Sequence, residues 1–373
     1  MTVPFIPGLE LARSFYGEIV RPVLDAEFPG LPYSAALIGW GSEVLGLDSA
    51  RSTDHNWGPR LQIFLADETA GLSAGVSDLL GARMPAEFRG YPTVFPASES
   101  ADLPSHWVTV AGLRSWLTGS LGFDPIAGIA LLDWLSVPTQ RLAEVTGGGV
   151  FHDGLPDLTS TAASSALRGA RPGSGGGLTA VRTALSWYPR DIWLYVLACQ
   201  WQRISQEQAF PGRCAEAGDD LGSALVTGRL VRDLMRLVLL MERRYPPYSK
   251  WLGTAFSRTA GGSELQPVLT AGLAATTWPE RERSMSAAYE AAARLHNKTG
   301  LTPPLDPAVR PAYYDRPYQV PDSAGFIRAL HDQISDEQVR ALPLIGAADQ
   351  FLDSTDALGS ATLRRAVAAE LGL

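Results

Sequence analysis

The segment at residues 39–65 constrains the fold more than any other part of the chain. Its sequence is GWGSEVLGLDSARSTDHNWGPRLQIFL: an apolar run ends in a Gly-Ser pair, a polar loop follows, and an Asp-His-Asn triplet opens a second apolar run. Short apolar runs bounded by turn residues are typical of buried strands. The backbone N–H groups of a tight glycine turn can face phosphate oxygens, and a nearby carboxylate can hold Mg²⁺. The segment therefore predicts two strands joined through a candidate phosphate-binding turn.

Helical and strand patterns alternate along the first part of the chain. The helical patterns lie at residues 8–28 and 70–84, and the strand patterns lie at 33–40, 60–66 and 106–111. Alternation of this kind is typical of an α/β domain, in which helices cover a sheet. We therefore expect a small α/β domain over residues 1–160.

A stretch rich in Ser, Ala and Gly, ending in GARPGSGGGL, follows this domain. Its composition is typical of a flexible linker, which we expect at residues 161–180. No Lys-Ser or Lys-Thr follows the glycines, so the stretch is not a nucleoside-triphosphate P-loop. Beyond it, apolar residues recur at helical spacing over 189–209, 222–244, 264–275, 280–296, 324–335 and 360–371. We therefore expect a mostly α-helical domain at residues 181–373 and an α+β chain overall.

Charge and cysteine content exclude several classes of protein. The net charge is −8 at pH 7, whereas general nucleic-acid binders are usually basic, so we expect no general nucleic-acid binding. The two cysteines, Cys199 and Cys214, are too few for a disulfide framework or a cysteine zinc site, and they suggest free thiols. The N-terminus has no signal-peptide pattern, and no run approaches the roughly 20 apolar residues of a membrane span. We therefore expect a soluble, cytoplasmic protein that makes no use of a membrane.

Gly41-Ser42 at the end of a strand, with Asp54 before the next one, resembles the nucleotidyltransferase superfamily typified by DNA polymerase beta. In that superfamily a Gly-Ser turn grips a triphosphate, an Asp-x-Asp one strand later binds two Mg²⁺ ions, and a third carboxylate lies on a further strand. Longer stretches resemble a bacterial family of nucleotidyltransferase-like proteins of unknown function: STDHNWGPR, YPRDIWLYVLACQWQRISQEQAFPGR, GDDLGS, PPYSKWLGTAF and IGAADQFLDSTD. This resemblance spans nearly the whole chain and implies a nucleotidyltransferase-like domain followed by a helical domain.

The resemblance implies roles for four residues of the opening segment. Gly41 and Ser42 would hold phosphate oxygens, and Asp54 would be the catalytic, metal-bridging carboxylate. Asn56 stands where the superfamily has its second aspartate, and its amide oxygen can ligate Mg²⁺ without adding a negative charge. The expected third strand, HWVTVA, carries no acid. These departures favour a one-metal site, a metal-free nucleotide pocket or a reused site, while an ordinary strand-ending turn is the alternative at Gly41-Ser42.

The motif GDDLGS offers a candidate general base in the helical half. It places Asp219 and Asp220 immediately before the apolar helical pattern at 222–244. Acids in that position commonly cap the helix and interact with its dipole. The alternative is that Asp220 takes a proton from an acceptor hydroxyl.

Three further residues of the helical half are candidates for binding the nucleotide: Arg213, Tyr248 and Lys250. Tyr248 and Lys250 lie in an aromatic-rich turn, PPYSKWLG. In nucleotidyltransferases with a helical second domain, a basic residue of that domain often meets the triphosphate, which is the role implied for Lys250. Alternatively, Lys250 covers Trp251 with its aliphatic stem. Nearer the C-terminus, Asp349, Gln350 and Asp353 belong to a polar cluster that we expect to form a turn with a helix cap.

The function that these observations favour is transfer of a nucleoside monophosphate from a triphosphate to a small-molecule hydroxyl or amine. Mg²⁺ and a nucleoside triphosphate are the implied cofactors, and a small molecule is the implied acceptor. Fold does not fix chemistry. An enzyme on the same scaffold with a different reaction, such as a cyclase, lyase or other transferase, is one alternative. A non-catalytic regulatory protein that keeps the nucleotide pocket is the other.

Overall fold

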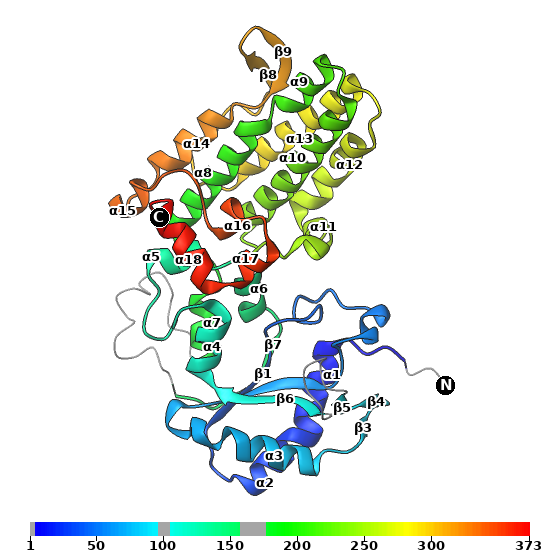
Figure 1. Cartoon of the computed structure of the whole chain (residues 1–373), viewed down its shortest axis with the longest axis vertical. Helices are drawn as coiled ribbons and strands as arrows, with labels where there is room; N and C mark the ends of the chain where they lie inside the picture. The colour runs from blue at the N-terminus through cyan, green and yellow to red at the C-terminus, as the bar shows by residue number, and fades with distance from the viewer. Residues whose placement is uncertain (1–3, 96–104, 157–176) are drawn as a thin grey trace. The chain divides into compact units, whose positions relative to one another are not determined.

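The chain forms two compact units in a computed structural model that describes residues 4–95, 105–156 and 177–373 (Figure 1). Unit 1 consists of Met1–Asp133 and Arg141–Ser186, and unit 2 consists of Trp134–Gln140 and Trp187–Leu373. The predicted linker at 161–180 falls largely outside the described residues. Its last four positions, 177–180, belong to helix α7 (Gly177–Ala184).

Unit 1 is built on a mixed five-stranded sheet. Its strands are β1 (Tyr33–Leu37), β2 (Arg60–Leu65), β5 (Val94–Phe95), β6 (Ser105–Gly112) and β7 (Gly149–Asp153), in the spatial order β5-β6-β2-β1-β7. Strand β2 pairs parallel with β6 and antiparallel with β1, and β7 pairs antiparallel with the other side of β1. The central strands β1 and β2 are buried along their whole length, which explains their continuous apolar sequences.

Helices cover both faces of this sheet (Figure 1). They are α1 (Gly8–Phe15), α2 (Arg21–Glu27), α3 (Ser73–Arg83) and α4 (Leu113–Leu121). On one face, apolar side chains of α1, α2 and α3 form a single core with Leu61, Ile63 and Leu65 of β2. Side chains alternate along a strand, so Phe64 points to the opposite face, where its ring contacts Trp116 of α4.

Unit 2 is a helical assembly around two long helices, α8 (Arg190–Glu207) and α10 (Asp220–Met241). Helix α8 packs against α10 and α14 (Ser323–Asp332), and α10 also packs against α12 (Ala260–Ala274) and α13 (Trp278–Lys298) (Figure 1). Shorter helices complete the unit: α9 (Phe210–Glu216), α11 (Ser249–Ser257), α15 (Glu337–Arg340), α16 (Ala348–Phe351), α17 (Thr355–Gly359) and α18 (Ala361–Glu370). A hairpin of β8 (Arg310–Tyr313) and β9 (Arg316–Val320) lies beside α13.

The predicted α+β class is confirmed, with the sheet in the N-terminal part and helices dominating the C-terminal part. The strands predicted at 33–40, 60–66 and 106–111 correspond to β1, β2 and β6. The Asp-His-Asn triplet does not open β2, however, because that strand begins at Arg60. Within the described residues, no helix combines the length and the apolar character needed to cross a membrane.

Candidate functional site

The Gly-Ser turn lies directly beyond the end of β1. Gly39 and Gly41 both have positive φ angles, +85° and +132°, which let the chain reverse sharply there. A Cβ atom at Gly41 would lie 2.1 Å from Nη2 of Arg60 and 2.7 Å from Oε2 of Glu43. Only glycine therefore fits at this position, because the side chains of Arg60 and Glu43 occupy the space that a Cβ atom would take.

A buried ion pair between Arg60 and Glu43 packs against the turn. The guanidinium of Arg60 contacts Oε1 of Glu43 through Nη2 at 2.5 Å and through Nε at 2.6 Å. Nη2 also donates to the carbonyl oxygen of Trp40 at 2.5 Å. The side chains of Arg60 and Glu43 are only 3% and 2% exposed. Burial lowers the pKa of Arg60, and the neighbouring Glu43 carboxylate opposes that shift.

Ser42 is half-buried, and its hydroxyl lies 3.4 Å from the hydroxyl of Ser52. Ser52 belongs to a 3₁₀ helix, Ala50–Asp54, whose N-terminus is capped by Ser49. The Ser49 hydroxyl accepts from the amide of Arg51, and the Ser52 hydroxyl accepts from the amide of Ser49. The polar loop is therefore ordered by its own hydroxyl groups, and it brings a serine close to the predicted phosphate-binding serine.

The Asp-His-Asn triplet is exposed and precedes β2. Asp54 ends the 3₁₀ helix, and its Oδ1 lies 2.6 Å from Nδ1 of His55. That hydrogen bond lowers the pKa of the Asp54 carboxyl, which is ionised at neutral pH. Asn56 has a φ of +51°, a left-handed conformation that asparagine tolerates better than most residues. The identity of Asn56 therefore has a backbone explanation in addition to any role in binding a metal.

The donor set for Mg²⁺ in this region is small. Among the described residues, no group of three or more His, Cys, Asp or Glu side chains gathers in a way that could hold a metal ion. The predicted ligands are one carboxylate, Asp54, and one neutral amide oxygen, Asn56. Mg²⁺ is commonly held by one or two carboxylates together with substrate phosphates and water. One carboxylate and one neutral amide oxygen are too few protein donors for a site that holds two ions without a ligand.

Asp219 and Asp220, the two acids at the start of α10, have different positions. Asp219 is the N-cap, and its carboxylate accepts from the amide of Gly222 at 2.7 Å. Asp220 is the first helical residue and is exposed. The capping interpretation is therefore correct for Asp219, while Asp220 has an exposed carboxylate at the positive end of the helix dipole.

The other nucleotide-binding candidates have partners within unit 2. Arg213 donates to the Tyr313 hydroxyl at 3.3 Å, and its guanidinium lies over the Phe210 ring. The Lys250 ammonium lies 5.0 Å from the centre of the Trp251 ring, as expected for a lysine that covers a tryptophan. Tyr248 is the N-cap residue of α11, and 46% of its side chain is exposed.

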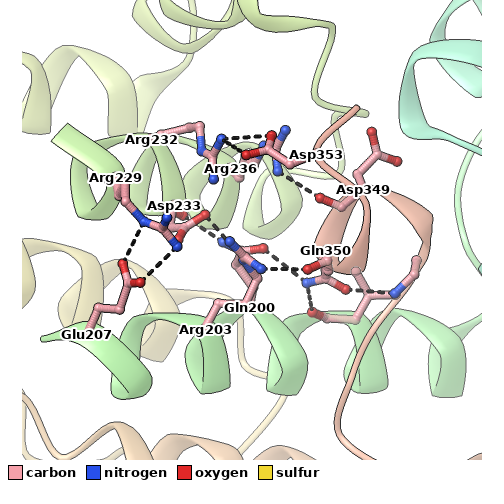
Figure 2. Close-up of polar contacts among 12 residues, drawn as sticks. Gln200, Arg203, Glu207, Arg229, Arg232, Asp233, Arg236, Asp349, Gln350 and Asp353 are labelled. Atoms are coloured by element: carbon pink, nitrogen blue, oxygen red, sulfur yellow. Dashed lines mark hydrogen bonds and ion pairs between the residues drawn. The ribbon is translucent and has the colours of Figure 1, made fainter. Parts of the chain in front are cut away.

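A network of arginines, missed at the sequence level, joins residues 347–353 to α8 and α10 (Figure 2). Nη1 of Arg203 donates to the Gln350 carbonyl oxygen at 2.5 Å, and Nη1 of Arg236 donates to the Asp349 carbonyl oxygen at 2.8 Å. Nη1 of Arg232 contacts both carboxylate oxygens of Asp353, at 3.0 and 3.2 Å. Three arginines thus hold a segment that is more than a hundred residues away in the chain.

Buried amides connect the same elements behind the arginines. The Gln350 side chain donates to the Val196 carbonyl oxygen and to Oε1 of Gln200, both at 3.0 Å. The Gln200 side chain donates in turn to the Asp233 carbonyl oxygen, also at 3.0 Å. Figure 2 shows these groups between α8, α10 and the segment at 347–353. Their exchange of hydrogen bonds fixes the position of that segment in unit 2.

A small cavity of about 20 Å³, whose lining surface is mostly apolar, lies next to this network. Its lining includes Tyr188, Arg236, Asp349 and Thr139, and the backbone amide of Thr139 donates to the Asp349 carboxylate at 2.7 Å. Burial raises the pKa of the Asp349 carboxyl, and the neighbouring Arg236 guanidinium lowers it in part. The Tyr188 hydroxyl and Nε of Arg236 are buried without a partner among the described residues. The volume suits a single water molecule.

Signals for the missed residues exist in the sequence. Arg60 opens a strand that is otherwise almost wholly apolar. Arg229, Arg232 and Arg236 are spaced three and four residues apart within an apolar helix, which puts them on one helical face. The partners Glu43 and Asp349 carry no such signal, because nothing in a pattern of periodicity pairs distant residues.

Part of the chain is similar to a known protein family. Residues 172–252 match a family model described as "Domain of unknown function (DUF4037)". The match covers less than a quarter of the chain and includes α8 and α10, the two helices that carry the arginine network. No curated protein and no solved structure matches the chain. The matched range therefore spans α7 of unit 1 and the central helices α8 and α10 of unit 2.

Proposed function

We propose that unit 1 binds a nucleoside triphosphate at the Gly41-Ser42 turn and transfers its nucleoside monophosphate to a small-molecule acceptor. The observation that carries the proposal is the turn itself. It directly follows a buried strand, it needs a glycine with a φ of +132°, and Ser42 stands next to that glycine. A bare backbone beside a hydroxyl suits the close approach of phosphate oxygens.

The order of the elements supports this proposal. A helical segment precedes β1, the turn follows it, β2 returns antiparallel, and β6 runs parallel to β2 after α3. The resemblance implies a Gly-Ser turn at the end of one strand and a further strand after it, and β1 and β2 are arranged in that order. Asp54 lies between the turn and β2, in the 3₁₀ helix that precedes this strand.

Nucleotidyl transfer depends mainly on positioning and on neutralising phosphate charge. In our proposal the Gly41-Ser42 turn orients the phosphates, and Asp54 and Asn56 hold one Mg²⁺ together with them. Bound Mg²⁺ would neutralise charge that develops on the phosphate oxygens. The roles expected for Asp220, Arg213, Tyr248 and Lys250 of the helical unit stay predictions. We further propose a cytoplasmic location, since both cysteines are free thiols.

The second candidate function is nucleotide binding without transfer, in a regulatory protein. The Asp-His-Asn triplet supports this alternative. Asp54 already shares a hydrogen bond with His55, and Asn56 adds no negative charge that would attract a metal ion. The same donor set would also suit a reaction on this scaffold other than nucleotidyl transfer.

One experiment separates these functions. Calorimetry with Mg²⁺ and each of the four common nucleoside triphosphates measures binding, and an assay with a panel of hydroxyl and amine acceptors measures pyrophosphate release. We expect binding and acceptor-dependent release, both lost or strongly reduced in Asp54→Asn. Asp78→Asn, which alters an exposed carboxylate on α3, is the matched control and should behave as wild type.

The outcomes differ clearly. If no triphosphate binds with Mg²⁺ or Mn²⁺, the proposed function is wrong. If binding occurs and no acceptor yields pyrophosphate, the regulatory alternative takes its place. Asn56→Asp restores the missing charge and should tighten Mg²⁺ binding in the presence of the nucleotide. An unchanged affinity would show that Asn56 does not face the metal.

A further inference from the structure

Trp40 immediately precedes the Gly41-Ser42 turn, and half of its side chain is exposed. The exposed fraction is 51%, while Trp57 of the same unit is only 5% exposed. A single exposed apolar residue needs no functional explanation by itself. Trp40 differs from such a residue because its ring packs against Arg60, which belongs to the buried ion pair of the turn.

The guanidinium of Arg60 lies over the Trp40 ring, with Cζ 4.0 Å from the ring centre. Arg60 is itself immobilised by Glu43 and by its hydrogen bond to the Trp40 carbonyl oxygen. A planar cation stacked on an indole is a favourable contact, and here it fixes the ring orientation before any ligand arrives. The ring is therefore a rigid, partly exposed aromatic surface next to the predicted phosphate-binding turn.

We propose that Trp40 is a stacking platform for the base of the bound nucleotide. This inference rests on the proposed function, since it requires a nucleotide at the Gly41-Ser42 turn. The base would stack on the part of the indole that Arg60 leaves uncovered, while the turn holds the phosphates. Every nucleobase has an aromatic face, so such a platform binds purines and pyrimidines without strong preference. The ligand class is thus a nucleoside triphosphate, bound at both its base and its phosphates.

The test compares a ligand that has a base with one that lacks it. Calorimetry on the full chain measures the dissociation constants of ATP and of inorganic tripolyphosphate, each with Mg²⁺. We expect Trp40→Ala to weaken ATP binding at least about tenfold and to change tripolyphosphate binding less than about twofold. Trp40→Phe keeps an aromatic face and should retain most of the ATP affinity.

Leu72→Ala is the matched control, because Leu72 is another large apolar residue of unit 1 that is 46% exposed. It should leave both affinities unchanged. Thermal melts of all three variants verify that the unit remains folded, and Trp40→Phe serves as the conservative substitution if Trp40→Ala unfolds.

The results distinguish this inference from the proposed function. If wild type binds ATP and tripolyphosphate and Trp40→Ala weakens neither, the stacking proposal is wrong while the proposed function survives. Equal weakening of both ligands also overturns it, because Trp40 would then act on the turn and not on the base. If wild type binds neither ligand, the proposed function and the stacking proposal fall together.

Discussion

At the scale of single residues, His296 shows how burial alone sets the behaviour of a titratable group. Its side chain is 1% exposed in unit 2. Nδ1 accepts a hydrogen bond from the Trp201 indole at 3.2 Å, so the proton of the neutral ring is on Nε2, which faces the Thr302 hydroxyl at 3.1 Å. Burial lowers the pKa of His296 from 6.5 to about 4. The folded protein therefore keeps this histidine neutral at pH values where the unfolded chain protonates it.

Stability should consequently fall on acidification below the unfolded pKa. Between pH 6.5 and about pH 4, His296 binds a proton in the unfolded chain and not in the folded chain. Lower pH therefore favours unfolding. The contribution of His296 between pH 7 and pH 5 is about 2 kcal/mol, an order-of-magnitude value from the linkage relation. Urea denaturation of wild type and of His296→Gln across this range measures it. The variant should be less stable at pH 7 and should have a flatter pH profile; an equally steep profile would exclude His296 as the source.

At the scale of the helix, Asp219 and Asp220 have different positions at the start of α10, which the sequence alone could not distinguish. Asp219→Ala removes the N-cap hydrogen bond to Gly222 and should lower the free energy of unfolding by about 1 kcal/mol. Asp220→Ala removes only an exposed charge in the first turn and should cost about 0.3 kcal/mol. Thermal or urea unfolding measures both losses, and each variant is a control for the other because both remove one carboxylate at adjacent positions. A larger loss for Asp220→Ala than for Asp219→Ala would contradict the assignment of the cap.

The arginines of α10 should also differ from one another. Arg236 donates to the backbone of Asp349, whereas Arg232 pairs with Asp353, whose side chain is 76% exposed. Exposed ion pairs contribute only about 0–1 kcal/mol, while losing a charged donor to a half-buried carbonyl group costs more. We expect Arg236→Met to speed hydrogen exchange of the amides at 347–353 about tenfold and Arg232→Met to change it much less. Equal effects of the two substitutions would show that the segment is held elsewhere.

Elements were predictable from the sequence where one local pattern was sufficient. The strands β1, β2 and β6 are marked by apolar, strand-forming residues, and the long helices by apolar residues at helical spacing. Strand β7 (Gly149–Asp153) is short, half-buried and partly polar, so its sequence shows no apolar strand pattern. It is a strand because it pairs with β1 in the folded sheet. The hairpin of β8 and β9 was missed for a related reason, since its strands carry arginines and prolines.

In the candidate site, too, local motifs were predictable from the sequence and contacts between distant residues were not. Gly41 and Ser42 were found from a local motif, and the structure adds the reason why residue 41 must be glycine. That reason is the pairing of Arg60 with Glu43, which are 17 residues apart and meet only because β2 folds back along β1. The network around Arg236 depends on a partner 113 residues away. Contacts of this kind come from tertiary structure and leave no periodicity in the sequence.

At the scale of the whole molecule, the chain passes from unit 1 to unit 2, back again, and to unit 2 once more. The inserted piece, Trp134–Gln140, makes hydrogen bonds to residues that come much later in the chain. Thr139 donates from its backbone to Asp349 and from its hydroxyl to the Pro246 carbonyl oxygen, each at 2.7 Å. Arg364 donates to the Ser136 carbonyl oxygen at 2.8 Å. The helical unit is therefore assembled from two separate stretches of chain.

This arrangement predicts that a fragment covering residues 181–373 alone is less stable than the unit it represents. At least four hydrogen bonds made by residues 134–140 would be lost, at about 1 kcal/mol each, and the half-buried Asp349 carboxylate would lose its amide donor. A second fragment, in which residues 131–143 precede residue 181 through a Gly-Ser linker, should recover much of the loss. Urea unfolding followed by tryptophan fluorescence compares the two fragments directly. If they unfold at the same urea concentration, the inserted segment contributes nothing to unit 2, whereas a shift of about 4 kcal/mol in the unfolding free energy is the expected result.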